Sequence, residues 1–204
     1  MYKLIRLALL PISAMAGLFI LEGCSSMAPP PSAEAHLQQP YHERIAVSGR
    51  FSASYQHQGR PENVQGRFQW HQRGDDIDID LLSPLGQTLA RIRVAPGLAL
   101  LERPGQQTQS AINASELTEQ MLGWAIPADG LRYWLQGFSR AGSAVRRVDL
   151  QTVDALMTEG WQVRFYSWQT SQHSSHPKRI DLAHSSSTAG DLALRLVIDS
   201  WEPR

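Results

Sequence analysis

The stretch GRFQWHQRGDDIDIDLLSPLG, residues 66–86, holds two strand-like runs joined by a turn. In the first run, Phe68 and Trp70 alternate with polar residues, and in the second, isoleucines alternate with three aspartates. Alternation with a period of two is typical of strands that bury one face and expose the other. The Arg-Gly-Asp tripeptide at 73–75 predicts a hairpin turn between the runs. The stretch therefore indicates antiparallel sheet, with the aspartates on a solvated outer face.

The same alternation recurs through most of the chain. Strands of this kind are expected at residues 45–55, 64–70, 77–81, 88–95, 98–102, 161–166, 180–182 and 192–198. Turns such as Pro96-Gly97 and Pro104-Gly105 punctuate them at the spacing of an antiparallel meander. Serine-rich segments at 171–175 and 185–187 are expected to be surface loops. The fold class that follows is mainly β, closing toward a barrel.

Two short helices interrupt this meander. Asn113 followed three residues later by Glu116 is a capping-box arrangement, which predicts a helix start. The helix is expected to carry Leu117, Met121 and Trp124 on one face, and Pro127 is expected to open a second helix through residue 135. Helices at this point of a curved sheet would cap its open mouth.

The N-terminus is typical of an exported lipoprotein. Lys3 and Arg6 precede an apolar run at 7–21, which has the length of a signal-peptide core and is too short to span a bilayer. Cys24, the single cysteine, follows this run in the sequence Leu21-Glu22-Gly23-Cys24, which resembles the lipobox of bacterial lipoproteins. We expect a signal peptide at 1–23, a lipidated proline-rich spacer at 24–34 with a short helix near 32–39, and one domain at 35–204.

Composition excludes several function classes. Removing residues 1–23 leaves 17 basic and 18 acidic side chains, so the mature charge is about −1 and no basic field exists to hold nucleic acid. With Cys24 acylated, no thiol remains for a disulfide or a metal site. His173 and His176 lack the spacing of metal ligands, and no nucleotide-binding or nucleophile motif is present. We expect no metal, no cofactor and no enzymatic activity.

Large apolar side chains gather on the predicted inner faces. The set comprises Phe51, Phe68, Trp70, Leu81, Trp124, Trp134, Trp161 and Phe165. One interpretation is an ordinary packed core. The other is the lining of a cavity that takes an apolar ligand, since such cavities are walled by rigid aromatic and aliphatic groups. The sequence leaves both open.

The segment Ser83-Pro84-Leu85-Gly86 suits a tight turn, with proline second and glycine fourth. The turn puts Leu85 at a hairpin tip, where a polar residue is usual. Either Leu85 folds back on the sheet, or it is an exposed apolar finger. Burial of a leucine in lipid contributes roughly 1.5–3 kcal/mol, which is enough for reversible contact with a bilayer.

Five segments occur in the order seen in LolB, a family of outer-membrane lipoprotein receptors. They are Gly49-Arg50-Phe51, Phe68-Gln69-Trp70, Pro84-Leu85-Gly86, the run at 122–127 and the run at 131–137. This resemblance implies an incomplete antiparallel β-barrel of the LolA/LolB kind, with helices plugging the open side over a hydrophobic cavity. It also implies a monomer that is lipid-anchored to the periplasmic face of the outer membrane.

The resemblance further implies a function. The protein would accept triacylated lipoproteins from a LolA-like periplasmic carrier and insert them into the outer membrane. The aromatic cavity would hold the acyl chains, and Pro84, Leu85 and Gly86 would form the membrane-insertion loop. Two rival hypotheses remain: a structural or assembly lipoprotein with a packed, ligand-free barrel, and a lipid-anchored periplasmic hydrolase.

Overall fold

The computed structural model describes residues 40–57, 59–141, 144–147, 156–158, 160–170, 174–186 and 190–204. The predicted signal peptide, Cys24, the spacer and the helix near 32–39 lie outside the described residues, as does His173. Pro31–Arg204 is one compact unit with its own apolar core, which is the property that lets a domain fold by itself. Among the residues described, no helix has the length and apolarity needed to cross a bilayer.

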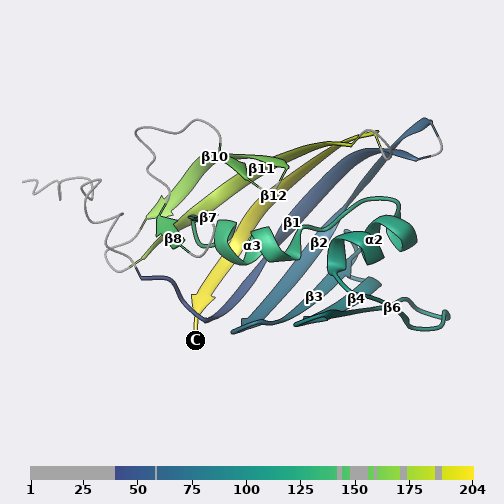
Figure 1. The fold of residues 1–204 in the computed structure, drawn as a ribbon, viewed down its shortest axis with the longest axis horizontal. Coiled ribbons are helices and arrows are strands. Elements are labelled where there is room, and N and C mark those ends of the chain that lie inside the picture. Colours follow the sequence, from purple (N-terminus) through teal and green to yellow (C-terminus); the bar gives the residue numbers. More distant parts are fainter. Residues whose placement is uncertain are drawn as a thin grey trace, which may run out of the picture. The chain divides into compact units, whose positions relative to one another are not determined.

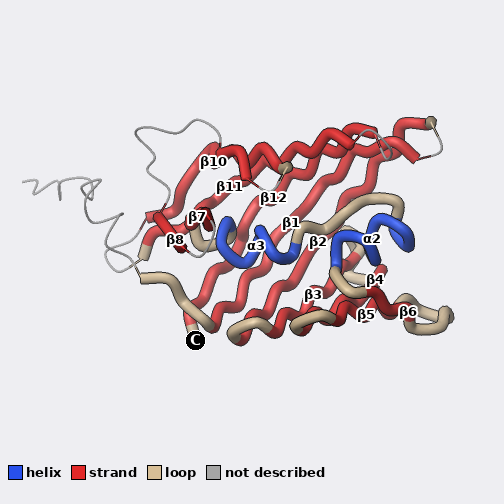
Figure 2. The backbone as a smooth tube through the Cα atoms, in the orientation of Figure 1, coloured by secondary structure: helices blue, strands red, loops and turns tan. Residues whose placement is uncertain are grey.

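One antiparallel sheet of ten strands dominates the fold (Figures 1 and 2). Its order is β6-β5-β4-β3-β2-β1-β12-β11-β10-β9, so the last long strand returns to pair with the first. The strands are β1 (Arg44–His57), β2 (Arg60–Arg73), β3 (Asp76–Leu82), β4 (Thr88–Ala95), β5 (Leu98–Glu102), β6 (Gln109–Ala111), β9 (Leu156–Thr158), β10 (Trp161–Thr170), β11 (Ser175–Ser186) and β12 (Gly190–Pro203). Because β6 and β9 do not pair with each other, the sheet is an incomplete barrel, as predicted.

The convex face of the sheet carries the charges. Within β2 and β3, buried residues alternate with exposed or half-buried ones along their central stretches. Asp78 lies 3.1 Å from Arg73, and Asp80 lies 3.2 Å from Arg91 on β4. The three aspartates therefore lie on a solvated outer face, where Asp78 and Asp80 pair with arginines, and this confirms the interpretation of residues 76–80.

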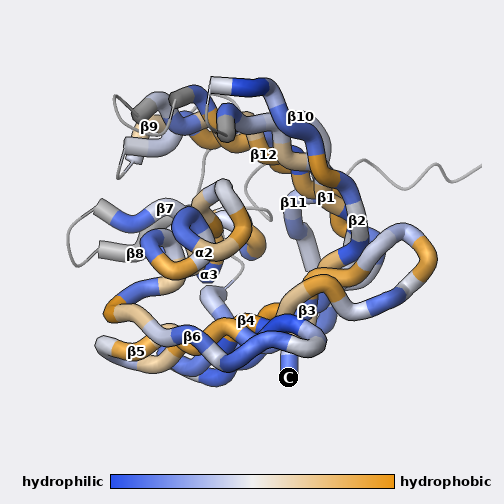
Figure 3. Tube along the Cα trace, turned by 90° about the vertical axis from the view of Figure 1, so that its right-hand side faces the viewer, coloured by the Kyte–Doolittle hydropathy of each residue, from blue (hydrophilic) through white to orange (hydrophobic). Residues whose placement is uncertain are grey.

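Two helices lie over the concave face, and the sheet curls around them (Figure 3). They are α2 (Ala114–Leu122) and α3 (Ala128–Trp134), followed by a small hairpin of β7 (Phe138–Ala141) and β8 (Ala144–Arg147). The Asn113 side chain accepts a hydrogen bond from the Glu116 amide at 2.9 Å, which confirms the predicted helix start. Pro127 stands just before α3, also as predicted.

Two local predictions were wrong. Gly123 adopts a φ of +83° and ends α2, so Trp124 lies beyond the helix rather than on its last turn. Ser175 is buried at the start of β11, and Ser185 belongs to the same strand rather than to a loop. Ser175 pairs with Thr170 of β10, and this non-local pairing outweighs the turn preference of serine.

Polar bonds fix α3 to one end of the sheet. Arg132, nearly buried, donates to the Asp75 carboxylate at 2.6 Å and to the Asp75 carbonyl at 3.0 Å. The Gln136 amide accepts from the His42 backbone at 2.9 Å and donates to its carbonyl at 3.0 Å. These bonds join the helix to the β2–β3 turn and to the segment before β1, so α3 is a fixed part of the wall.

Reciprocal glycine–phenylalanine pairs shape the concave face. In the register of β1 and β2, Gly49 stands opposite Phe68, and Phe51 stands opposite Gly66. A Cβ at Gly66 would lie 2.9 Å from the Phe51 ring and would clash with the Leu82 carbonyl oxygen. Each ring therefore occupies the space above a glycine of the neighbouring strand, an arrangement that stabilises strand glycines and permits curvature.

We expect Gly66→Ala to lower the free energy of unfolding by about 1–3 kcal/mol, because the added methyl group overpacks the contact between Phe51 and β3. Ser52→Ala, on the exposed face of β1, is the matched control and should change stability by less than about 0.5 kcal/mol. Urea denaturation followed by circular dichroism measures both. Equal stability of the two variants would contradict the close packing described for Gly66.

Candidate functional site

A small apolar cavity lies between the sheet and the helices, with a volume of about 30 Å³. Five of the eight residues predicted to line a cavity do so: Phe51, Phe68, Trp70, Leu81 and Trp124. The lining also includes Ile79, Ile126, Leu131, Leu135, Leu194 and Leu196, which the sequence-based list omitted. All eleven lining residues are apolar, so the wall can hold hydrocarbon and offers no group for acid–base chemistry.

Several of the lining residues that the prediction omitted lie in recognisable sequence patterns. Leu194 and Leu196 alternate along the last strand, and Ile79 alternates along the aspartate run, so their inner-face positions could be read from the sequence. Ile126 lies between the two helices, where no periodicity indicates which way a side chain points.

The other three predicted residues lie elsewhere in the domain. Trp134 and Trp161 are buried with ring centroids 6.4 Å apart, and Trp161 packs against His184 at 4.8 Å. Phe165 is only partly buried and packs on Trp168 at 5.5 Å. Phe165 pairs in register with the buried Ile180 of β11 and packs against the core, so alternation placed it on the correct face; the register of β10 shifts only beyond it, toward Trp168.

Trp124 closes the cavity opposite the sheet. Its ring stacks on Phe51 with centroids 5.7 Å apart and planes at 27°. The next wall residue, Ile126, is bound to α2: its amide donates to the Thr118 hydroxyl at 2.8 Å, and its carbonyl accepts from Ser115 at 3.1 Å. The 123–127 segment is thus tied by polar bonds to its own helix, and Trp124 meets the sheet through an aromatic contact.

The cavity is too small for a long ligand in this conformation. A volume of about 30 Å³ holds little more than a water molecule, whereas an apolar cavity of about 150 Å³ is needed for benzene. An alkyl chain would enter only if part of the wall moved. In the described conformation the cavity therefore has no room for an alkyl chain.

The turn after β3 exposes its apolar tip. Leu85 is 92% exposed, so the alternative in which it folds back on the sheet is wrong. The Gly86 amide donates to the Ser83 carbonyl at 2.9 Å, and the Ser83 hydroxyl accepts from the Gln87 amide at 3.1 Å. Gly86 has a φ of +88°, which glycine adopts without strain. The backbone of this loop is ordered by its own bonds, which leaves the Leu85 side chain free.

Comparison with known proteins places this chain among outer-membrane lipoproteins. The model of the family described as "Outer membrane lipoprotein LolB" matches residues 43–201. Proteins named outer-membrane lipoprotein LolB are similar along nearly their whole length. The one from Cupriavidus necator is 39% identical over 97% of this chain and 98% of its own, and the one from Nitrosococcus oceani is 33% identical over 92% and 94%. Among solved structures, the LolA superfamily protein NE2245 from Nitrosomonas europaea has a TM-score of 0.47 at 11% identity, over 85% of this chain and 94% of that one.

We expect Trp124→Ala to accelerate uptake of an apolar fluorescent probe, because it removes the ring that closes the cavity. The substitution should also lower the free energy of unfolding by about 3–5 kcal/mol. Trp134→Ala is the matched control, since Trp134 is equally buried but absent from the cavity wall. It should cost similar stability without faster uptake. Stopped-flow fluorescence measures uptake, and identical rates in the two variants would contradict the assignment of Trp124 as the closing residue.

Proposed function

The chain belongs to the LolB family of outer-membrane lipoproteins, and we propose that it accepts triacylated lipoproteins from a LolA-like periplasmic carrier and inserts them into the outer membrane. The observation that carries this proposal is the wholly apolar cavity between the sheet and the helices. We further propose that Cys24 carries the lipid anchor. An unmodified cysteine in the mass spectrum of the membrane-extracted protein would contradict that anchor.

The cargo explains why a protein is needed. Three acyl chains of about 15 methylenes each, at roughly 0.8 kcal/mol per methylene, would cost on the order of 30–40 kcal/mol to expose to water. Lipoproteins therefore require a continuous apolar environment between carrier and bilayer. The sequence contains no nucleotide-binding motif. Transfer in this proposal runs down a gradient of affinity from carrier to receptor to membrane.

The tight packing of the cavity wall explains why a bound acyl chain would be released. An acyl chain that separates Trp124 from Phe51 must replace an aromatic stack and fill the space that it opens. When the chain leaves for the bilayer, the wall closes on itself and no water-filled void remains. A receptor of this kind binds its cargo less tightly than a preformed cavity would, because opening the wall consumes part of the binding free energy. Modest affinity suits a protein that must pass its cargo on.

Leu85 suits the last step. A single leucine at an exposed tip can enter the apolar layer, and its contribution of roughly 1.5–3 kcal/mol permits repeated insertion and withdrawal. The tip is on the turn between β3 and β4, at the opposite end of the strands from the β2–β3 turn that holds α3. Membrane contact therefore need not disturb the bonds that fix α3.

The nearly filled core is also what a structural lipoprotein without a ligand would show. Membership of the LolB family favours the receptor, and probe uptake by the folded protein distinguishes the two. The hydrolase hypothesis has no support at this cavity, because all eleven residues that line it are apolar.

We expect Leu85→Glu to leave folding and acceptance of cargo intact and to abolish deposition into liposomes, because a carboxylate opposes insertion into lipid. Leu85→Met keeps an apolar tip and should deposit cargo as wild type does. Gln87→Glu adds the same charge two residues away at an exposed position of the loop and should have the smaller effect. A two-step assay of acceptance from the carrier and release into liposomes measures this, with a thermal melt of each variant.

Normal deposition by Leu85→Glu would show that the loop is incidental to transfer. A large loss of thermal stability would contradict the exposed position of Leu85. Failure of wild type to accept acylated cargo would reject the receptor function itself.

A further inference from the structure

A basic groove of about 500 Å³ lies on the outside of the sheet beside the Leu85 turn. Arg50 of β1, Arg67 of β2 and Arg195 of β12 line it together with Asp199, and Pro84 forms part of its rim. The groove therefore begins one residue from the exposed apolar tip. Its three arginines are exposed and alternate along their strands with the buried residues of the concave face, and Phe51 is common to the linings of the groove and the cavity.

The charges of the groove are not balanced. Arg50 and Arg67 stand directly opposite each other in the pairing of β1 and β2, an arrangement of like charges that destabilises a sheet. Asp199 pairs with Arg50 at 3.0 Å. In the described part of the chain, no carboxylate forms an ion pair with Arg67, which is exposed.

The third arginine of the groove, Arg195, shares its carboxylate partner with another arginine. Arg195 lies 3.0 Å from Asp181, which Arg179 also contacts at 2.8 Å. Burial opposes ionisation of Asp181, but the hydrogen bonds and charges of the two arginines outweigh burial and hold its pKa below the usual range. Asp181 is therefore a carboxylate shared between two guanidinium groups, and the groove keeps an excess of positive charge beside an otherwise nearly neutral chain.

We propose that this groove binds the phosphate of an anionic phospholipid headgroup while Leu85 is inserted in the bilayer. Guanidinium groups bind phosphate oxygens through paired hydrogen bonds, and an oxyanion between Arg50 and Arg67 would relieve their repulsion. The inference rests on the proposed insertion of Leu85, and it adds the chemistry that the membrane surface must present.

The spacing along the chain fits this arrangement. Arg67 pairs with Leu82, three residues before Leu85, so the tip extends at most about 10 Å beyond the arginine. Apolar groups of interfacial proteins enter the boundary between headgroups and acyl chains by about 5–10 Å. When Leu85 is at that depth, Arg67 and Arg50 lie at the level of the phosphates. An acidic protein partner would supply the charge but not the apolar layer that the adjoining Leu85 requires.

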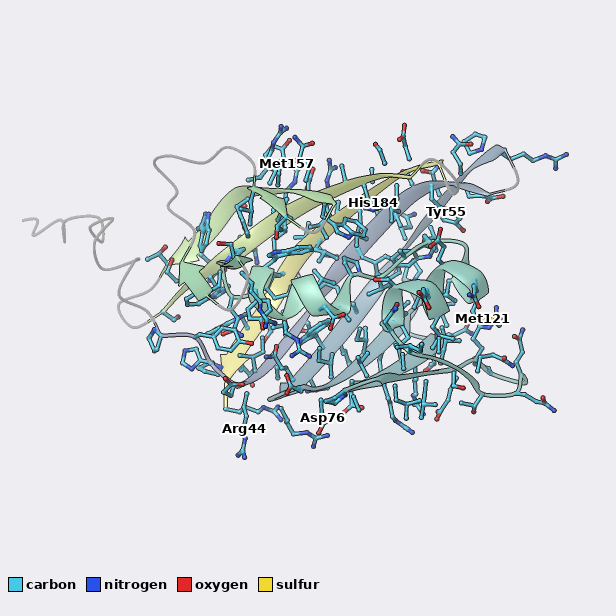
Figure 4. All side chains as sticks on the ribbon, viewed as in Figure 1. Arg44, Tyr55, Asp76, Met121, Met157 and His184 are labelled. Carbon is cyan, nitrogen blue, oxygen red and sulfur yellow. The ribbon has the colours of Figure 1, made fainter. Side chains whose placement is uncertain are left out.

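The test uses the unacylated Pro31–Arg204 unit, so that the lipid anchor does not dominate binding. Its dissociation constant is measured by cosedimentation with vesicles of phosphatidylethanolamine and phosphatidylglycerol, and with vesicles of phosphatidylcholine. The variants are Arg67→Gln, the double variant Arg50→Gln/Arg67→Gln, Leu85→Glu and the control Arg44→Gln. Arg44 is an exposed arginine on the same strand as Arg50, and Figure 4 shows it beside Asp76 at the end of the sheet remote from Tyr55.

We expect Arg67→Gln to weaken binding to phosphatidylglycerol vesicles about five-fold and the double variant about twenty-five-fold, from the usual contribution of a basic residue at an anionic surface. The salt dependence should become shallower in both variants. Arg44→Gln should bind as wild type does. Binding to phosphatidylcholine vesicles should be weak, and its dissociation constant should be the same for wild type and Arg67→Gln. Thermal melts should shift only slightly, because Arg67→Gln removes a like-charge contact and the double variant also loses the exposed Arg50–Asp199 pair.

Equal binding by Arg67→Gln and Arg44→Gln would overturn the proposal, whether both variants bind normally or both are equally weakened. If the arginine variants bind normally while Leu85→Glu does not, the insertion loop stands and the headgroup site is rejected. Absence of wild-type vesicle binding rejects both. Wild-type binding of inorganic phosphate without any preference for phosphatidylglycerol vesicles would identify a free-anion site instead.

Discussion

The contact between aromatic rings and strand glycines at the centre of the sheet governs the rest of the structure. Phe51 and Phe68 lie over Gly66 and Gly49, where a Cβ would lie less than 3 Å from the ring and would also clash with a backbone oxygen. The sheet can therefore curl tightly around α2 and α3 while keeping a continuous hydrocarbon surface on its concave face. Trp124 stacks on that surface, so the geometry of the glycine pairs also determines how the cavity closes.

The two sides of the helical plug are held in different ways. Arg132 of α3 and Gln136, just after it, form charged and amide hydrogen bonds with the β2–β3 turn and with the segment before β1. The 123–127 segment directs its polar bonds to α2, and α2 contacts the β5–β6 turn through Arg103, which donates to the Met121 carbonyl at 3.0 Å. Separating stacked rings breaks no hydrogen bond of the segment. We infer that the wall opens at Trp124 while α3 stays in place.

Much of this architecture is readable from local sequence patterns. Period-two alternation identified the long strands and their inner faces, and β4 and β5 have the predicted bounds of 88–95 and 98–102. Turn chemistry at Ser83 and Gly86 correctly placed Leu85 at a tip. The resemblance to LolB supplied the function, which alternation alone does not contain.

The features of the fold and of the site that the sequence did not predict depend on contacts between segments that are distant in the chain. Alternation placed Phe165 on the inner face but does not report that it is only partly covered there, and periodicity through Gly123 wrongly extended α2 to Trp124. The alignment of Arg50 with Arg67 requires the register of β1 and β2, so the groove was absent from the sequence-based list of sites. The size of the cavity depends on how completely side chains from β1, β2, β3, β12, α3 and its C-cap, and the 123–127 segment fill a common space. The sequence of any one of these segments does not determine that volume.

The central claim is that the closed apolar core is the site that receives an acyl chain. A crystal structure of the protein with a bound palmitoylated amphiphile tests it most directly, through the distance between the Phe51 and Trp124 rings. The account predicts that the alkyl chain lies between these rings and separates them beyond their present 5.7 Å, with the Arg132–Asp75 pair unchanged. A chain bound elsewhere on the domain, with the two rings still stacked, would contradict it.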